Sequence, residues 1–206
     1  FCDKEGIRQL FVEVDVLSDR NIQMNPPNRC YYCKSRIFSA MKQVANSIGI
    51  TTVAEGSNMD DLSDYRPGLK AIQELTVISP LRAAGLNKGE IRILSRNMGL
   101  DTWQNPSMAC LASRIEYGEG LTEESLRRIE RAEKLLRNMG FSQCRVRKHG
   151  RIARIEVLPE EIKRLLEDNT RTLVVEELLA MGFSYVTMDM KGFRAGSMNE
   201  TISKNV

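Results

Sequence analysis

The sequence has no long apolar run, little net charge and a single histidine, and each of these shortages excludes a class of function. No apolar run approaches the roughly twenty residues that span a bilayer, and no signal peptide is visible, so no membrane partner is expected. The net charge is only +3, so the overall balance does not call for a nucleic-acid partner. A single histidine, His149, lies far from the cysteine motifs. Five cysteines in a chain rich in lysine and glutamate indicate a cytoplasmic protein with reduced thiols.

Three of the cysteines form the most informative pattern. Cys30 and Cys33 make a C-x-x-C motif at the predicted start of a helix, and Cys110 can join them only through the fold. Three thiolates leave the fourth position of a metal centre open, which in iron–sulfur chemistry means one iron free to bind an external ligand. A redox dithiol and a purely structural role are the alternatives for the pair. Cys2 and Cys144 are expected to be structural.

The order of predicted elements indicates an α/β fold in two domains. Residues 1–116 are expected to form a parallel sheet with flanking helices that is incomplete at its N-terminus, and residues 117–206 a smaller α/β domain. The first part has predicted strands at 10–16 and 51–54 and predicted helices at 33–48 and 88–98. The second part has predicted helices at 122–139, 159–166 and 170–181, a hairpin of strands 144–148 and 151–157, and a strand at 185–190.

Three polar segments are candidate binding sites. A loop after the second predicted strand carries Asp60, Asp61, Asp64 and Arg66, which suit Mg²⁺, a phosphate or simply a fixed acidic loop. Arg145 and Arg147 alternate on one strand, so both side chains face one way; they predict either an anion site or an exposed basic edge. The glycine-rich segment 190–199, which contains Arg194, is expected to be an anion cradle or, more in keeping with its composition, a tail.

Taken together, four motifs resemble the LarE family of the PP-loop ATP pyrophosphatase superfamily, which shares an adenine nucleotide alpha hydrolase-like fold. They are Asp60-Asp61-x-x-Asp64-Tyr65-Arg66-Pro67-Gly68, Ala109-Cys110-Leu111-Ala112-Ser113-Arg114, Arg145-Val146-Arg147 and Gly192-Phe193-Arg194-x-Gly196-Ser197-Met198-Asn199. The resemblance covers nearly the whole chain. The superfamily signature Ser-Gly-Gly-x-Asp-Ser is absent from this sequence and is expected upstream of Phe1.

The resemblance implies an ATP-dependent sulfurtransferase. Such an enzyme adenylates the carboxylates of pyridinium-3,5-biscarboxylic acid mononucleotide and converts them to thiocarboxylates for a nickel-pincer cofactor. It implies a [4Fe-4S] cluster on Cys30, Cys33 and Cys110, with Cys110 as the catalytic cysteine, and ATP with Mg²⁺ near the aspartate loop. It also implies sulfide or another sulfur donor and a homo-oligomer, a hexamer by resemblance. The implied substrate-binding residues are Arg145, Arg147, Ser113, Arg114, Glu133 and Arg194.

Two other functions compete with this one. A tRNA thiolase of the same superfamily would share the cluster, but it would normally carry an RNA-binding module or a broad basic face, and neither is evident. A non-catalytic zinc protein would use the same cysteines. It would leave the aspartate loop and the Arg145 and Arg147 pair unexplained.

Overall fold

The computed structural model describes residues 1–63, 65–105, 109–194 and 196–201 of the protein. The chain is mixed α/β and divides into two compact units: residues 1–22 with 28–91, and residues 23–27 with 92–206. The predicted domains, 1–116 and 117–206, are a different division and stay a prediction. In the part of the chain that is described, every helix is too short or too polar to cross a bilayer.

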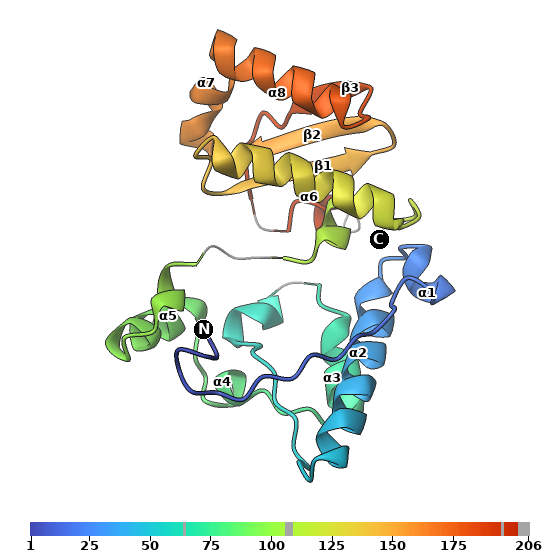
Figure 1. Cartoon of the computed structure of the whole chain (residues 1–206), viewed down its shortest axis with the longest axis vertical. Helices are drawn as coiled ribbons and strands as arrows, with labels where there is room; N and C mark the ends of the chain where they lie inside the picture. The colour runs from blue at the N-terminus through green and yellow to red at the C-terminus, as the bar shows by residue number, and fades with distance from the viewer. Residues whose placement is uncertain (64, 106–108, 195, 202–206) are drawn as a thin grey trace. The chain divides into compact units, whose positions relative to one another are not determined.

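The first unit is mainly helical (Figure 1). Its elements are α1 (Arg20–Gln23, whose last residue falls in the second unit), α2 (Arg29–Ser47), η1 (Met59–Ser63), α3 (Gly68–Glu74), α4 (Pro80–Ala83) and the beginning of α5 (Lys88–Asn97). Helices α2 and α3 pack together, and Lys42 of α2 donates to the Leu75 carbonyl at the end of α3 over 2.7 Å. The predicted helices at 33–48 and 88–98 are confirmed, the first beginning four residues earlier than predicted.

The predictions of a strand at residues 10–16 and of a strand at residues 51–54 are both wrong. Residues 7–16 form no strand, although Val12, Val14 and Val16 are half-buried and alternate with exposed neighbours such as Phe11, which is 91% exposed. Around residues 51–54 the structure has an isolated parallel bridge, from Ala54 to Ile78. Alternation is a local signal, whereas a strand also needs a partner to hydrogen-bond with. The described residues of this unit supply no ladder, so the PP-loop-like sheet stays a prediction.

The second unit contains the sheet and follows the predicted order closely. Its elements are η2 (Asp101–Gln104), η3 (Leu111–Arg114), α6 (Glu123–Asn138), β1 (Cys144–His149), β2 (Ile152–Val157), η4 (Pro159–Glu161), α7 (Ile162–Leu165), α8 (Asp168–Ala180), β3 (Tyr185–Met188) and η5 (Asn199–Thr201). The strands are ordered β1-β2-β3, with β1 antiparallel and β3 parallel to β2. The predicted hairpin, helices and last strand are confirmed.

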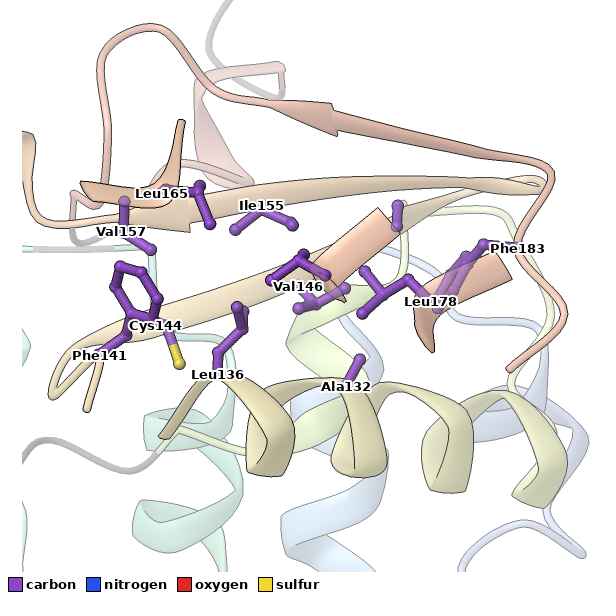
Figure 2. Packing of buried hydrophobic residues seen from close by; sticks show 12 residues of the cluster. Ala132, Leu136, Phe141, Cys144, Val146, Ile155, Val157, Leu165, Leu178 and Phe183 are labelled. Atoms are coloured by element: carbon purple, nitrogen blue, oxygen red, sulfur yellow. The ribbon is translucent and has the colours of Figure 1, made fainter. Parts of the chain in front are cut away.

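The two faces of this sheet differ in chemistry. One face is apolar: Val146 and Cys144 of β1 point toward Ala132 and Leu136 of α6 in a fully buried cluster that Figure 2 shows from close by. Helices α7 and α8 complete that cluster through Leu165, Val174 and Leu178. Burial raises the pKa of the Cys144 thiol to about 11, with the Glu133 carboxylate adding to the effect. The opposite face carries charged side chains, because strand residues alternate between faces.

Helix α6 begins at a side-chain cap that offers a direct test of the fold. The Thr122 hydroxyl accepts from the Ser125 amide at 3.1 Å, and Glu123 and Glu124 occupy the first turn. We expect Thr122→Ala to lower the free energy of unfolding by about 1 kcal/mol, since that amide loses its acceptor. Urea unfolding measures the change, and Thr122→Ser, which keeps the hydroxyl, should match the wild type. Equal stability of the alanine variant would contradict the assigned cap.

Candidate functional site

The three candidate cysteine ligands come from two different units. Cys30 and Cys33 lie three residues apart near the start of α2, both half-buried, while Cys110 is exposed immediately before η3. The buried Arg29 donates from Nη2 to the Cys30 sulfur at 3.5 Å. Among the described residues, no preformed group of three or more His, Cys, Asp and Glu side chains has metal-site geometry. Convergence of the three sulfurs on one centre therefore stays a prediction.

The aspartate loop of the first unit is held together by its own side chains. Asp61 accepts from the Asn58 amide at 3.0 Å and pairs with Arg66 at 2.9 Å. Asp60 accepts from the Lys88 amide at 3.0 Å, which ties the loop to the start of α5. These contacts support the alternative in which the aspartates fix the loop. Asp64 lies outside the described residues, and a role of the loop in binding ATP and Mg²⁺ stays a prediction.

The segment that carries Cys110 is fixed by hydrogen bonds to its backbone. The Ser113 amide and hydroxyl both donate to the Cys110 carbonyl, at 2.9 and 2.7 Å. The Arg114 Nη1 donates to the carbonyls of Ala109 and Cys110 at 3.0 and 3.1 Å. The result is a short 3-10 turn in which the Cys110 carbonyl accepts several hydrogen bonds while Cys110 itself stays exposed.

Arg114 is paired with Glu133 of α6, and both side chains are buried. The Arg114 Nε and Nη2 donate to the two carboxylate oxygens of Glu133 at 2.8 and 3.1 Å. The same carboxylate accepts from the Val146 amide on the edge strand β1 at 3.1 Å. Glu133 thus connects α6, the edge of the sheet and the Cys110 segment.

The charged face of the sheet, which we call the arginine face, consists of Arg145 and Arg147 of β1 with Arg154 and Glu156 of β2. The Arg147 Nε and Nη2 bind both oxygens of Glu156 at 3.1 and 2.9 Å, and Glu156 also accepts from Arg154 at 3.1 Å. Arg147 is 5% exposed and Glu156 is fully buried. Burial shows that the alternative of an exposed basic edge is wrong, while Val146 packs inward as predicted.

Arg145 lies on the arginine face near the guanidinium groups of Arg114 and Arg147. Its Nη1 donates to the Cys144 carbonyl at 2.7 Å, and its guanidinium lies 5.2 Å from the centroid of the Phe193 ring. Burial, followed by the nearby Arg114 guanidinium, lowers the pKa of Arg145. A bound anion would offset that repulsion, so this position suits a phosphate or carboxylate.

The glycine-rich segment after β3 is part of the fold, so the expectation of a tail is wrong. The Phe193 amide donates to the Val157 carbonyl at 2.7 Å, and the Ser197 hydroxyl donates to Glu156 at 2.8 Å while accepting from Arg147 at 2.9 Å. A side chain at Gly192 would place its Cβ 2.8 Å from that same carbonyl, so the close approach requires glycine. This segment covers the arginine face.

Arg194 in that segment forms ion pairs with Glu200 and Asp189 of this chain rather than lining an open anion site. Its Nε and Nη2 donate to Glu200 at 2.5 and 3.0 Å, and its Nη1 donates to Asp189 at 3.1 Å. The bond to Glu200 contributes most to a raised pKa of the Arg194 guanidinium, and Asp189 adds to it. The contacts support an anchoring role; a role in substrate binding stays a prediction.

Sequence reasoning missed Glu156 as a site residue, and it missed that the Ser197 hydroxyl contacts both Glu156 and Arg147. Glu156 had a usable signal, because it follows Arg154 by two residues on a predicted strand and so shares a face with it. Ser197 lies in the glycine-rich motif quoted above, but nothing in the sequence indicated its contact with β2, which joins residues far apart in the chain. Ser113 was predicted as a site residue. The structure adds that its backbone carbonyl accepts from the Arg147 Nη1 at 2.9 Å, a contact that could not be predicted from the sequence.

The comparisons with known proteins agree with the motifs. The chain matches no protein-family model. It is 40% identical over 199 residues to an uncharacterised protein of Synechocystis sp., covering 97% of this chain and 74% of that protein. It is 27% identical over 184 residues to an uncharacterised protein of Methanocaldococcus jannaschii, covering 89% of this chain and 71% of that protein.

A third relative has a name that describes a reaction. The chain is 40% identical over 191 residues to the pyridinium-3,5-bisthiocarboxylic acid mononucleotide synthase of Lactiplantibacillus plantarum, covering 93% of this chain and 68% of the synthase. Identity at this level over so much of both proteins, together with the four motifs in the same order, shows that the two proteins belong to one family. The chain belongs to the LarE family, the family of the pyridinium-3,5-bisthiocarboxylic acid mononucleotide synthase.

Proposed function

We propose that the protein is a sulfur-inserting enzyme that converts carboxylates of pyridinium-3,5-biscarboxylic acid mononucleotide to thiocarboxylates. The observation that carries the proposal is the 40% identity to a synthase named for the bisthiocarboxylic acid product. The exposed Cys110 beside a buried arginine face supports it, because an anionic substrate needs cations and sulfur transfer needs an accessible thiol or sulfide.

The chemistry proposed has two steps. A carboxylate oxygen of the substrate attacks the α-phosphorus of ATP, with Mg²⁺ bound to the phosphates, and pyrophosphate leaves. The acyl-adenylate then has AMP as its leaving group, so a sulfur nucleophile adds to the carbonyl carbon and expels AMP. The oxygen lost from the carboxylate departs with AMP. Activation is needed because a free carboxylate is a poor electrophile at neutral pH.

The thiols present fit a [4Fe-4S] cluster as the source of that sulfur. Cys30 and Cys33 are three residues apart near the start of α2 and so lie on one face of the helix, which suits two ligands of a single centre, and no disulfide joins any of the three thiols. The bond from Arg29 to the Cys30 sulfur would stabilise a thiolate. With Cys110 as the third ligand, the bound cluster would supply sulfide at the iron that no cysteine occupies.

The reaction itself can be tested with the complete enzyme. It is incubated without oxygen with the pyridinium substrate, ATP, Mg²⁺ and sulfide, and the products are followed by mass spectrometry. We expect exchange of carboxylate oxygen for sulfur, with AMP and pyrophosphate formed in step with it. Unmodified tRNA serves as the competing substrate. Thiolation of tRNA with an unchanged pyridinium compound would reject the proposal in favour of a tRNA thiolase.

We assign the substrate phosphate to Arg145. Arg145→Lys keeps the positive charge but loses the planar fork, so we expect the KM for the substrate to rise about tenfold or more with little change in kcat. The control is Arg151→Lys, on the exposed hairpin turn, whose KM should equal that of the wild type. A wild-type KM for the Arg145 variant would move the phosphate site elsewhere.

A further inference from the structure

We propose that Arg114 and Glu133 are positioning residues, which hold the backbone of Cys110 so that its sulfur points out of the second unit. This inference rests on the proposed sulfur transfer and assigns these two residues a different task from the substrate contact that the family resemblance implies. Neither side chain would touch the substrate. Both would act on the reaction through the Cys110 segment.

The hydrogen bonds of Arg114 are the first line of support. A guanidinium has five N–H donors. In Arg114 the Nε donor and one Nη2 donor go to Glu133, and Nη1 faces the Ala109 carbonyl, the Cys110 carbonyl and the Ser113 hydroxyl at 3.0, 3.1 and 3.0 Å. Four of the five donors therefore have acceptors within the protein. A guanidinium used in this way is poorly suited to grip a phosphate with a two-pronged bond.

The position of Glu133 is the second line of support. Its Oε1 accepts from both the Arg114 Nε and the Val146 amide, and its Oε2 accepts from the Arg114 Nη2. One carboxylate of α6 therefore connects the Cys110 segment to the strand β1. It contacts Arg137 more weakly, at 3.5 Å, and Arg137 is half-exposed. A change at Glu133 would therefore be transmitted to the backbone of residues 109–114.

Burial gives the third line of support. Arg114 and Glu133 are each 2% exposed. A buried ion pair gains little net stability, because the desolvation of both charges offsets their attraction, and replacing it by neutral groups often costs nothing. What the pair does provide is a fixed geometry, with several directional bonds converging on two peptide carbonyls. Small displacements of a reacting group lower turnover steeply, by about a hundredfold for a misplacement of about 1 Å.

The kinetic test separates positioning from substrate binding. In the complete enzyme we expect Arg114→Lys and Glu133→Gln to lower kcat about a hundredfold while the KM for the pyridinium substrate stays within about twofold of the wild type. Arg137→Ala is the matched control, since it removes a Glu133 partner that makes no bond to the Cys110 segment, and it should keep the wild-type kcat. A raised KM at constant kcat would overturn the proposal and make the pair substrate ligands.

A second measurement needs neither cluster nor activity. Hydrogen exchange on the iron-free protein follows the Ser113 amide, which donates to the Cys110 carbonyl. We expect peptides over residues 109–116 to exchange at least about tenfold faster in Arg114→Lys and Glu133→Gln, with the hairpin of β1 and β2 unchanged. Unchanged exchange in residues 109–116 would overturn the proposal even if kcat fell. If the wild-type enzyme transfers no sulfur, the proposed function fails, and exchange still decides whether the pair holds the segment.

A double variant separates positioning from folding. Arg114→Met with Glu133→Gln removes both buried charges, and the new amide oxygen can still accept from the Val146 amide, so we expect wild-type-like thermal stability. The guanidinium bonds to the Ala109 and Cys110 carbonyls are gone, so kcat should stay low and residues 109–116 should still exchange fast. Recovery of both kcat and slow exchange in this folded double variant would show that the pair serves charge balance alone and would overturn the proposal.

Discussion

Glu156→Ala is expected to lower the free energy of unfolding by about 3–5 kcal/mol, a large share of the roughly 5–15 kcal/mol of a typical domain. The carboxylate is fully buried and accepts from Arg147 through two bonds, from Arg154 and from Ser197. Its removal leaves the Arg147 guanidinium desolvated without its counter-charge, which costs far more than the pair contributes. Urea unfolding of the complete protein measures the difference.

The matched control for that substitution is Glu123→Ala in the first turn of α6. Glu123 pairs with Arg127 one helical turn away, but both side chains are exposed, so its loss should cost less than about 0.5 kcal/mol. Glu156→Gln should fall between the two, since its amide oxygen still accepts one bond while its amide nitrogen faces a donor. If Glu156→Ala were as stable as Glu123→Ala, the arginine face would not be held by Glu156.

The second large effect concerns iron. We expect the complete protein, purified without oxygen, to be brown and to contain about four iron and four sulfide per chain. Cys30→Ala, Cys33→Ala and Cys110→Ala should each remove most of the iron and the absorbance, because a cluster held by three thiolates has no spare ligand. Cys2→Ala, which alters a thiol outside the proposed set, should retain both. Stoichiometric zinc with no iron would contradict the cluster and favour the zinc alternative.

Elements that depend on neighbours in the chain were predictable from the sequence. Helix α6 combines a threonine cap, acidic residues in its first turn and a glycine stop at Gly140, and each signal acts within one helical turn. The hairpin of β1 and β2 turns at Gly150, where the backbone has a positive φ of 56°. Alternation along β1 correctly placed Val146 in the core and the two arginines together on the other face.

Elements that depend on distant partners were not predictable. The alternation of residues 10–16 is present in the structure as alternating burial, but a strand requires a second chain segment beside it. The segment after β3 resembles a tail in composition, yet Ser197 sits between Arg147 and Glu156, two residues that only the folded hairpin brings together. The same holds for the site, since strand alternation identifies an arginine pair but does not show that Glu156 already binds Arg147.

The buried thiol of Cys144 has a consequence for how the protein withstands air. With a pKa of about 11, roughly one Cys144 side chain in ten thousand is a thiolate at pH 7. Oxidants attack thiolates and not thiols, so the burial of Cys144 protects it twice: it keeps the thiol protonated and it keeps oxidants away from the sulfur. The apolar cluster around it should therefore survive exposure to oxygen unchanged. Oxidative damage to this protein is then expected to begin at the proposed cluster and its three cysteines and to leave the core of the second unit folded.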